Sequence, residues 1–165
     1  SFNIIAKKYD NIKLTLIGDT SNKIRYKELR NKISNLKLTE KIIFTGKLER
    51  DEVPRYLCEP SILVLASPIS MRSTGSVPCK LGEYLATGNP VVVTNVGEIS
   101  DYLKDEVSAF LADPNDVNSF TKKLEYVILN PVLAKKVGIK GKEIASKFFN
   151  SKVQADRIIK YIDRF

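Results

Sequence analysis

Residues 79–95 read CKLGEYLATGNPVVVTN and join a short helix to an apolar strand. The helix runs into Gly88 and Pro90, two residue types that end helices, and the strand follows at once. Residues 90–95 are apolar almost throughout, so the strand is covered on both faces. Strands of this kind are typical of a parallel sheet between two layers of helices. The stretch therefore predicts an α/β fold.

The rest of the chain continues this alternation of strands and helices. Strands are predicted at 13–18, 41–46, 61–67, 90–95 and 108–113. Helices are predicted at 2–9, 23–36, 51–59, 97–103, 117–129, 131–148 and 151–164, besides the one ahead of Gly88. This order predicts a doubly wound, mainly parallel open sheet with helices on both faces, in a Rossmann-like arrangement. The length fits one domain over residues 1–165, and because the chain opens within a helix we expect it to be part of a longer protein.

The composition excludes several classes of protein. The chain contains no histidine, which excludes Ser-His-Asp catalysis and histidine-ligated zinc within it. Cys58 and Cys79 lie 21 positions apart, a spacing that fits neither a metal site nor a disulfide framework. We expect both to be buried structural thiols in a reducing cytoplasm. With 43% apolar residues but no long apolar run, nothing in the sequence predicts a transmembrane segment.

The formal net charge is +8, from 27 Lys and Arg against 19 Asp and Glu. Such a surface attracts phosphates, nucleic acid or anionic lipid, or is simply a solvated lysine-rich surface. The lysines are spread along the helices and are not interleaved with aromatic residues. The pattern therefore disfavours a nucleic-acid-binding domain.

The predicted functional site lies at the loop before the quoted helix. In open α/β sheets the ligand binds beyond the carboxyl ends of the strands. The longest loop, PISMRSTGSVP at 68–78, follows such a strand and leads into the N-terminus of a helix, where unpaired N–H groups and the helix dipole suit a phosphate or diphosphate. Glu83, near the start of that helix, could accept two hydrogen bonds from a ribose 2′,3′-diol. Alternatively, it is a first-turn acid that only favours the helix dipole.

KLGEYLATGNPVVVTNVGEISDYL, residues 80–103, resembles the donor-binding segment of the retaining glycosyltransferases of family 4, the group 1 glycosyl transferases. Four further blocks agree in order and spacing: 8–19, 41–57, 61–68 and 108–120. The resemblance implies the GT-B architecture, in which two Rossmann-like domains face each other. It identifies this chain with the C-terminal, donor-binding domain and implies an N-terminal acceptor domain as its partner.

The resemblance also assigns roles to individual residues. It implies that Glu83 holds the ribose hydroxyls and that the loop and helix start lie near the diphosphate and sugar, through Gly75, Ser76, Lys80 and Leu81. It places two strand ends near the base, through Gly18, Asp19, Gly46, Lys47 and Leu48. The sequence departs from the family at Gly75, where many members carry a second glutamate that faces the sugar, and in the spacing of Pro78 from Glu83. The catalytic residues stay unknown.

Four residues or segments have two interpretations. Lys80 could partly replace the family's diphosphate-binding basic pair or be an exposed helix lysine. Asp19 could contact the base or be a turn acid or helix cap. Gly82 could permit the close approach of a ligand or strand, or serve packing alone. The apolar stripe of residues 151–164 could mark an interface with the N-terminal domain or be ordinary core.

These observations predict that the parent protein is a retaining glycosyltransferase of surface polysaccharide or glycan synthesis. The expected donor is a UDP- or GDP-sugar, and the expected location is the cytoplasm. We expect the protein to need neither a cofactor nor a metal ion. Association of the full-length protein with the inner face of the membrane stays open. The alternative is a non-catalytic nucleotide or nucleotide-sugar binding module or subunit. A Rossmann dehydrogenase is disfavoured because the turn after residues 13–18 lacks a G-x-G-x-x-G pattern.

Overall fold

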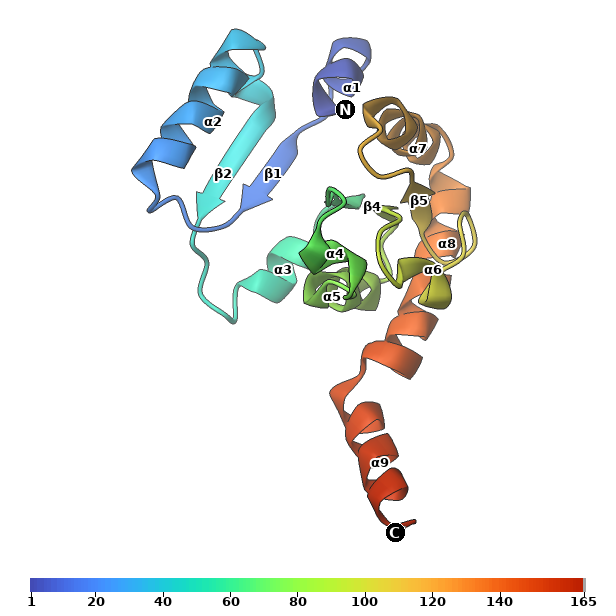
Figure 1. Cartoon of the computed structure of the whole chain (residues 1–165). Helices are drawn as coiled ribbons and strands as arrows, with labels where there is room; N and C mark the ends of the chain where they lie inside the picture. Colours follow the sequence, from blue (N-terminus) through green and yellow to red (C-terminus); the bar gives the residue numbers. More distant parts are fainter. Residues whose placement is uncertain (165) are drawn as a thin grey trace. The chain divides into compact units, whose positions relative to one another are not determined.

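The computed structural model describes residues 1–164, apart from the side chain of Arg72. The chain forms two compact units, Ser1–Tyr56 and Leu57–Phe165. Figure 1 follows the chain through both. The division falls within the short helix α3 (Val53–Cys58), and each unit is described by itself.

The first unit is a β-α-β motif preceded by a helix. Its elements are α1 (Phe2–Lys8), β1 (Leu14–Ile17), α2 (Lys23–Asn35), a 3-10 turn (Thr39–Lys41) and β2 (Ile42–Gly46). The two strands pair in parallel, with Leu14 opposite Ile42. A small core of Ala6, Ile33 and Leu38 holds the helices against them.

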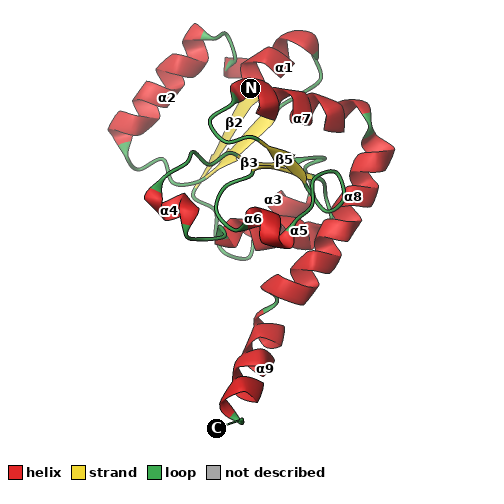
Figure 2. Cartoon of the chain, turned by 45° about the vertical axis from the view of Figure 1, so that its right-hand side comes forward, coloured by secondary structure: helices red, strands yellow, loops and turns green. Residues whose placement is uncertain are grey.

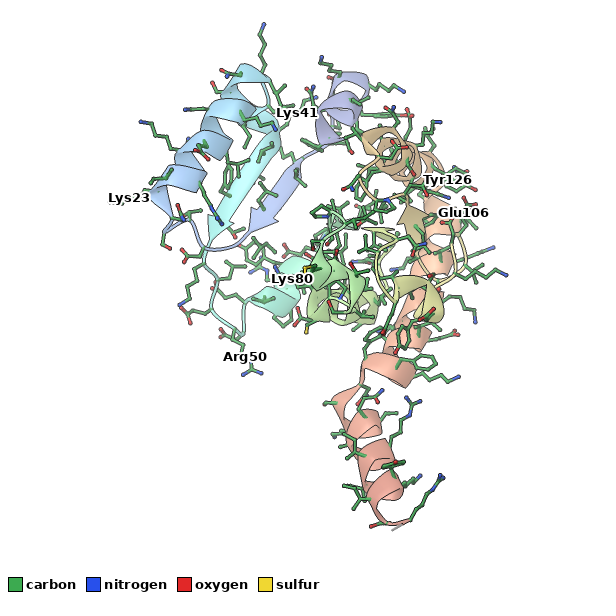
Figure 3. The ribbon with its side chains drawn as sticks, in the orientation of Figure 1. Lys23, Lys41, Arg50, Lys80, Glu106 and Tyr126 are labelled. Atoms are coloured by element: carbon green, nitrogen blue, oxygen red, sulfur yellow. The ribbon has the colours of Figure 1, made fainter. Side chains whose placement is uncertain are left out.

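Lys41 fixes the end of α1 in this unit. Its ammonium donates hydrogen bonds to the carbonyls of Ala6 (2.7 Å) and Tyr9 (3.1 Å), and Figure 3 labels its position. A cation at the C-terminus of a helix satisfies unpaired carbonyls and complements the helix dipole.

The second unit contains a three-stranded parallel sheet. Its strands are β3 (Leu63–Leu65), β4 (Val91–Thr94) and β5 (Phe110–Ala112), in the order β3-β4-β5. Its helices are α4 (Met71–Thr74), α5 (Cys79–Thr87), α6 (Ile99–Tyr102), α7 (Val117–Leu129), α8 (Pro131–Ile144) and α9 (Ser151–Ile162), with a π-helical segment (Ala145–Phe149) after α8. Figure 2 shows α7 on one side of this sheet and α5 and α6 on the other.

The predicted fold class is confirmed, since the strands are parallel and helices cover them. All four residues of β4 are buried, as its apolar sequence predicted. The strands fall into two hydrogen-bonded sheets, one in each unit.

Two expectations from the sequence are wrong, and one of the two interpretations of residues 151–164 is excluded. Residues 68–78 are not all loop, because Ser70 and Ser73 form a reciprocal capping box that starts α4. Cys58 and Cys79 are exposed rather than buried, because they occupy helix ends. In the described chain α9 buries no residue, so its stripe is not core.

The helix predicted over 131–148 ends as a π-helical segment, which turns two aromatic rings inward. Phe148 and Phe149 each lie 5.5 Å from the ring of Tyr102. A Cβ atom on Gly82 would lie 3.0 Å from the Cβ of Phe149. Gly82 therefore permits the packing of α5 against this segment, which is the second of its two interpretations.

Candidate functional site

A hollow of about 160 Å³ lies at the carboxyl end of the three-stranded sheet. It is lined by residues that follow each of the three strands: Ile69, Ser73, Thr74, Asn95, Val96, Gly97 and Pro114. This is where an open α/β sheet binds its ligand. The hollow is smaller than the ~300–1,000 Å³ of a typical site for a drug-sized ligand, so it suits a fragment such as a phosphate or one sugar ring.

Thr94 joins two strand ends beside this hollow. Its hydroxyl accepts a hydrogen bond from the Ser67 amide (2.8 Å) and donates one to the Ser67 carbonyl (2.9 Å). Only 5% of Thr94 is exposed. The hydroxyl is thus engaged in holding the ends of β3 and β4 together.

Gly97 brings the loop after β4 against the segment that leads into α5. Its φ is +59°, and a Cβ atom there would lie 2.3 Å from the Ser73 carbonyl oxygen and 2.9 Å from that of Ser76. Only glycine fits such a left-handed position in close contact with another backbone. The rule that ligands bind beyond the carboxyl ends of parallel strands predicts a ligand near this strand end, but the sequence does not show that Gly97 shapes the loop before α5.

The N-terminus of α5 has no side-chain cap. Its N-cap residue is Pro78, which offers no side-chain acceptor, and the Leu81 amide turns back to the Pro78 carbonyl (2.8 Å). Cys79 and Lys80 precede that amide and are exposed. Figure 3 labels Lys80. An uncapped helix start next to a lysine offers backbone N–H groups, partial positive charge and a full charge to an anion.

Glu83 lies in the second turn of α5, as its fifth residue, and no acid occupies the first turn. The effect of a helix dipole falls off within the first turn, so the dipole does not account for Glu83. Its side chain is exposed and has no hydrogen-bond or ion-pair partner among the described residues. Burial, and secondarily the negative charge of Glu83, raise the pKa of Tyr84. Lys80 and Glu83, three positions apart, share one side of the helix.

The other residues predicted for the site in this loop and helix differ in their exposure to solvent. Gly75 ends α4 with open space around its Cα, and Ser76 is exposed. Leu81 is completely buried, and with Leu85 it anchors α5 in the core. A donor contact by Leu81 stays a prediction, as do the contacts of Gly75 and Ser76.

In the first unit, the structure brings the two predicted strand ends together. The Gly18 amide donates to the Gly46 carbonyl (3.1 Å). Asp19 accepts hydrogen bonds of 2.7 Å from both the hydroxyl and the amide of Ser21. These bonds, and then the charge of Lys47, hold the pKa of the Asp19 carboxyl below its ordinary value.

Asp19 is therefore a turn acid, as one interpretation proposed, and a contact with a base stays a prediction. Leu48, the last residue predicted for this unit, is half-buried. The role assigned to it near the base also stays a prediction.

A second hollow, of about 280 Å³, lies between the α6–β5 loop and α8 and contains none of the predicted site residues. Within residues 1–164, no three His, Cys, Asp or Glu side chains cluster so that they could hold a metal ion. Nor does any described helix combine the length and apolarity needed to cross a membrane.

The family model for glycosyl transferases group 1 matches residues 1–144. The chain belongs to this family. The match includes both units' predicted site residues, from Gly18 to Glu83. It shows the family likeness that residues 80–103 had indicated.

Two curated glycosyltransferases match this group 1 chain in sequence. An uncharacterized glycosyltransferase of Methanocaldococcus jannaschii is 31% identical over 138 residues, which is 84% of this chain and 36% of the relative. The Escherichia coli UDP-Gal:alpha-D-GlcNAc-diphosphoundecaprenol alpha-1,3-galactosyltransferase is 26% identical over 147 residues, 89% of this chain and 33% of the relative. The chain thus spans about a third of the length of these relatives.

Solved structures show the same fold. Anabaena HepE in complex with UDP-glucose superposes with a TM-score of 0.82 at 18% identity, over 98% of this chain and 43% of HepE. At that identity the likeness shows the fold alone. It supports the Rossmann-like assignment made from the order of strands and helices.

Proposed function

We propose that this chain is the donor-binding domain of a retaining glycosyltransferase that takes its sugar from a nucleotide diphosphate, UDP or GDP. The observation that carries the proposal is Glu83, an exposed carboxylate without a partner in the described chain, one turn behind an uncapped helix start. The diphosphate would bind the first amides of α5 and Lys80. Glu83 would then accept hydrogen bonds from the ribose diol.

This arrangement suits the chemistry of the donor. When the sugar leaves, negative charge develops on the diphosphate. Preorganised amides at a helix start and a lysine ammonium stabilise such charge without a metal ion. The chain's own part in the reaction is therefore to bind and orient the donor and to stabilise its leaving group.

The relatives support a nucleotide-sugar donor. The name of the Escherichia coli relative gives UDP-Gal as its donor and a sugar on diphosphoundecaprenol as its acceptor. HepE was solved with UDP-glucose. We therefore propose a UDP-sugar first and a role of the parent protein in cytoplasmic steps of surface polysaccharide or glycan assembly. Further residues of the parent would supply the acceptor site. In the first unit, Gly18, Asp19, Gly46, Lys47 and Leu48 are proposed to contact the base.

The two exposed cysteines provide a direct test. Cys79 is the first residue of α5, next to the proposed diphosphate site, whereas Cys58 ends α3. UDP and UDP-glucose should slow the alkylation of Cys79 by a maleimide, and Cys58 serves as the internal reference for general effects on the fold. Equal rates at Cys79 with and without UDP, GDP or their glucose conjugates would contradict the proposed site.

A transfer assay separates the enzyme from the binding module. The full-length parent protein should release UDP from UDP-glucose or UDP-galactose in the presence of a lipid-diphosphate-linked sugar. Protection of Cys79 without any such turnover would support the alternative of a non-catalytic nucleotide-sugar binding module.

A further inference from the structure

The outward face of α8 combines exposed aliphatic side chains with lysines. The helix turns Ala134, Val137, Gly138 and Gly141 into the unit, where they are buried. Gly138 packs so closely that a Cβ atom there would lie 2.5 Å from the Gly88 carbonyl oxygen. The opposite face of α8 therefore points to solvent, and Figure 2 shows the helix along the outer edge of the second unit.

Aliphatic side chains form the middle of this outward face. Val132 is 72% exposed and Ile139 is 49% exposed, and residues seven positions apart lie on one line of a helix. In the sequence, Leu129 at the end of α7 (62% exposed) lies three positions before Val132, and Leu133 (38%) directly follows Val132. Large apolar side chains exposed on one line of a helix, with two more exposed beside it in the sequence, are unusual for a surface that meets only water.

Lysines flank this line on both sides. Lys136 and Lys140 lie on one side of it by helical spacing, and Lys135 and Lys142 on the other, and all four are exposed. The single acid of α8, Glu143, pairs with Lys140 at 2.9 Å. We call the eight residues Leu129, Val132, Leu133, Lys135, Lys136, Ile139, Lys140 and Lys142 the α8 face.

We propose that the α8 face docks the chain onto an anionic lipid bilayer. Aliphatic side chains enter the boundary between headgroups and acyl chains, and lysines beside them reach the phosphates with their flexible stems along the surface. Nucleic acid fits this face less well, because the face has neither an arginine nor an aromatic ring on which a base could stack. The binding requires no nucleotide, so it is independent of the proposed donor site.

Helix α2 provides a matched control because it is also basic but lacks an apolar line. It carries five basic residues and one acid. Its exposed aliphatic residues Ile24 (73%) and Leu29 (41%) lie five positions apart, on different sides of the helix. The change Lys27→Gln with Lys32→Gln alters the net charge as much as Lys136→Gln with Lys142→Gln does on the α8 face.

The test is co-sedimentation of the 165-residue chain with vesicles. The chain should bind vesicles of phosphatidylglycerol and phosphatidylcholine and should bind pure phosphatidylcholine vesicles far more weakly. Each lysine lost near an anionic surface costs about fivefold in binding, so Lys136→Gln with Lys142→Gln should weaken it by roughly 25-fold. The α2 pair should have a clearly smaller effect.

An apolar variant tests the other half of the inference. Val132→Ser with Ile139→Ser leaves the charge unchanged and should weaken binding by about tenfold or more, because part of the buried aliphatic area is lost. The inference is overturned if the chain does not bind the anionic vesicles, if the α2 pair matters as much as the α8 pair, or if the apolar variant binds like the parent. It is also overturned if a DNA duplex binds with the same dependence on Lys136 and Lys142.

Discussion

Substitution of Gly97 by alanine tests the contact that shapes the loop before α5. At φ = +59° an alanine must adopt a left-handed conformation, which lowers the free energy of unfolding by about 1–2 kcal/mol. Its Cβ would also lie 2.3 Å from the Ser73 carbonyl oxygen, and forcing an added methyl into a packed site costs a further ~1–3 kcal/mol. We therefore expect Gly97→Ala to lower the free energy of unfolding by about 2–5 kcal/mol.

Gly88→Ala is the matched control. Its φ is +76°, so it has the same conformational cost, but its Cβ would meet only the side chain of Lys142, at 3.3 Å from Cδ and 3.8 Å from Cβ, and no backbone atom. Urea unfolding can be followed by far-UV circular dichroism. If the free energies of unfolding of the two variants differ by ~2 kcal/mol, a typical dependence of that free energy on urea concentration gives the Gly97 variant a midpoint about 1 M lower than that of the Gly88 variant. Equal midpoints for the two variants would refute the close contact at Gly97.

Two further predictions concern charged groups. Lys123 pairs with Asp105 (2.5 Å) and Glu106 (2.7 Å), and its side chain is only 21% exposed. Lys123→Met should therefore lower the free energy of unfolding by about 1–2 kcal/mol, whereas Lys140→Met, which removes an exposed pair, should lower it by less than ~1 kcal/mol. Equal losses for the two variants in urea unfolding would contradict this prediction. A ¹³C NMR titration should give the Asp19 carboxyl a pKa below its ordinary value of 3.8. The stabilising effect of this carboxylate is therefore present above pH 3.8 and is lost as the pH falls through the lowered pKa. A measured pKa at or above 3.8 would contradict the hydrogen bonds from Ser21 to Asp19.

Local signals predicted most of the elements. The bounds of α7 agree with the prediction of 117–129, because Asp116 caps its first amides and apolar residues recur at helical spacing. The strand at Val91–Thr94 followed from an unbroken apolar run. By contrast, α4 is a single turn whose start depends on reciprocal hydrogen bonds of two serines, and such serines are equally common in loops.

Features that depend on contacts between distant residues could not be predicted. The division into two compact units follows from the three-dimensional distribution of contacts. The role of Gly97 depends on a loop more than twenty positions earlier, and that of Gly82 depends on Phe149. For the candidate site, the sequence correctly placed Glu83 on α5 behind an uncapped start, but it could not show that the carboxylate lacks a partner in the described chain.

The central claim is that the Glu83 carboxylate binds the ribose of the donor nucleotide. Isothermal titration calorimetry of the chain and of Glu83→Gln, each with UDP and with 2′-deoxy-UDP, tests it most directly. Loss of a charged hydrogen-bond acceptor costs ~1.5–3 kcal/mol, so Glu83→Gln should weaken UDP binding by about 10- to 150-fold. The parent chain should bind 2′-deoxy-UDP more weakly than UDP, and the variant should bind the two nearly equally. Unchanged UDP affinity in Glu83→Gln, or an undiminished preference for the ribose hydroxyl, would contradict the account.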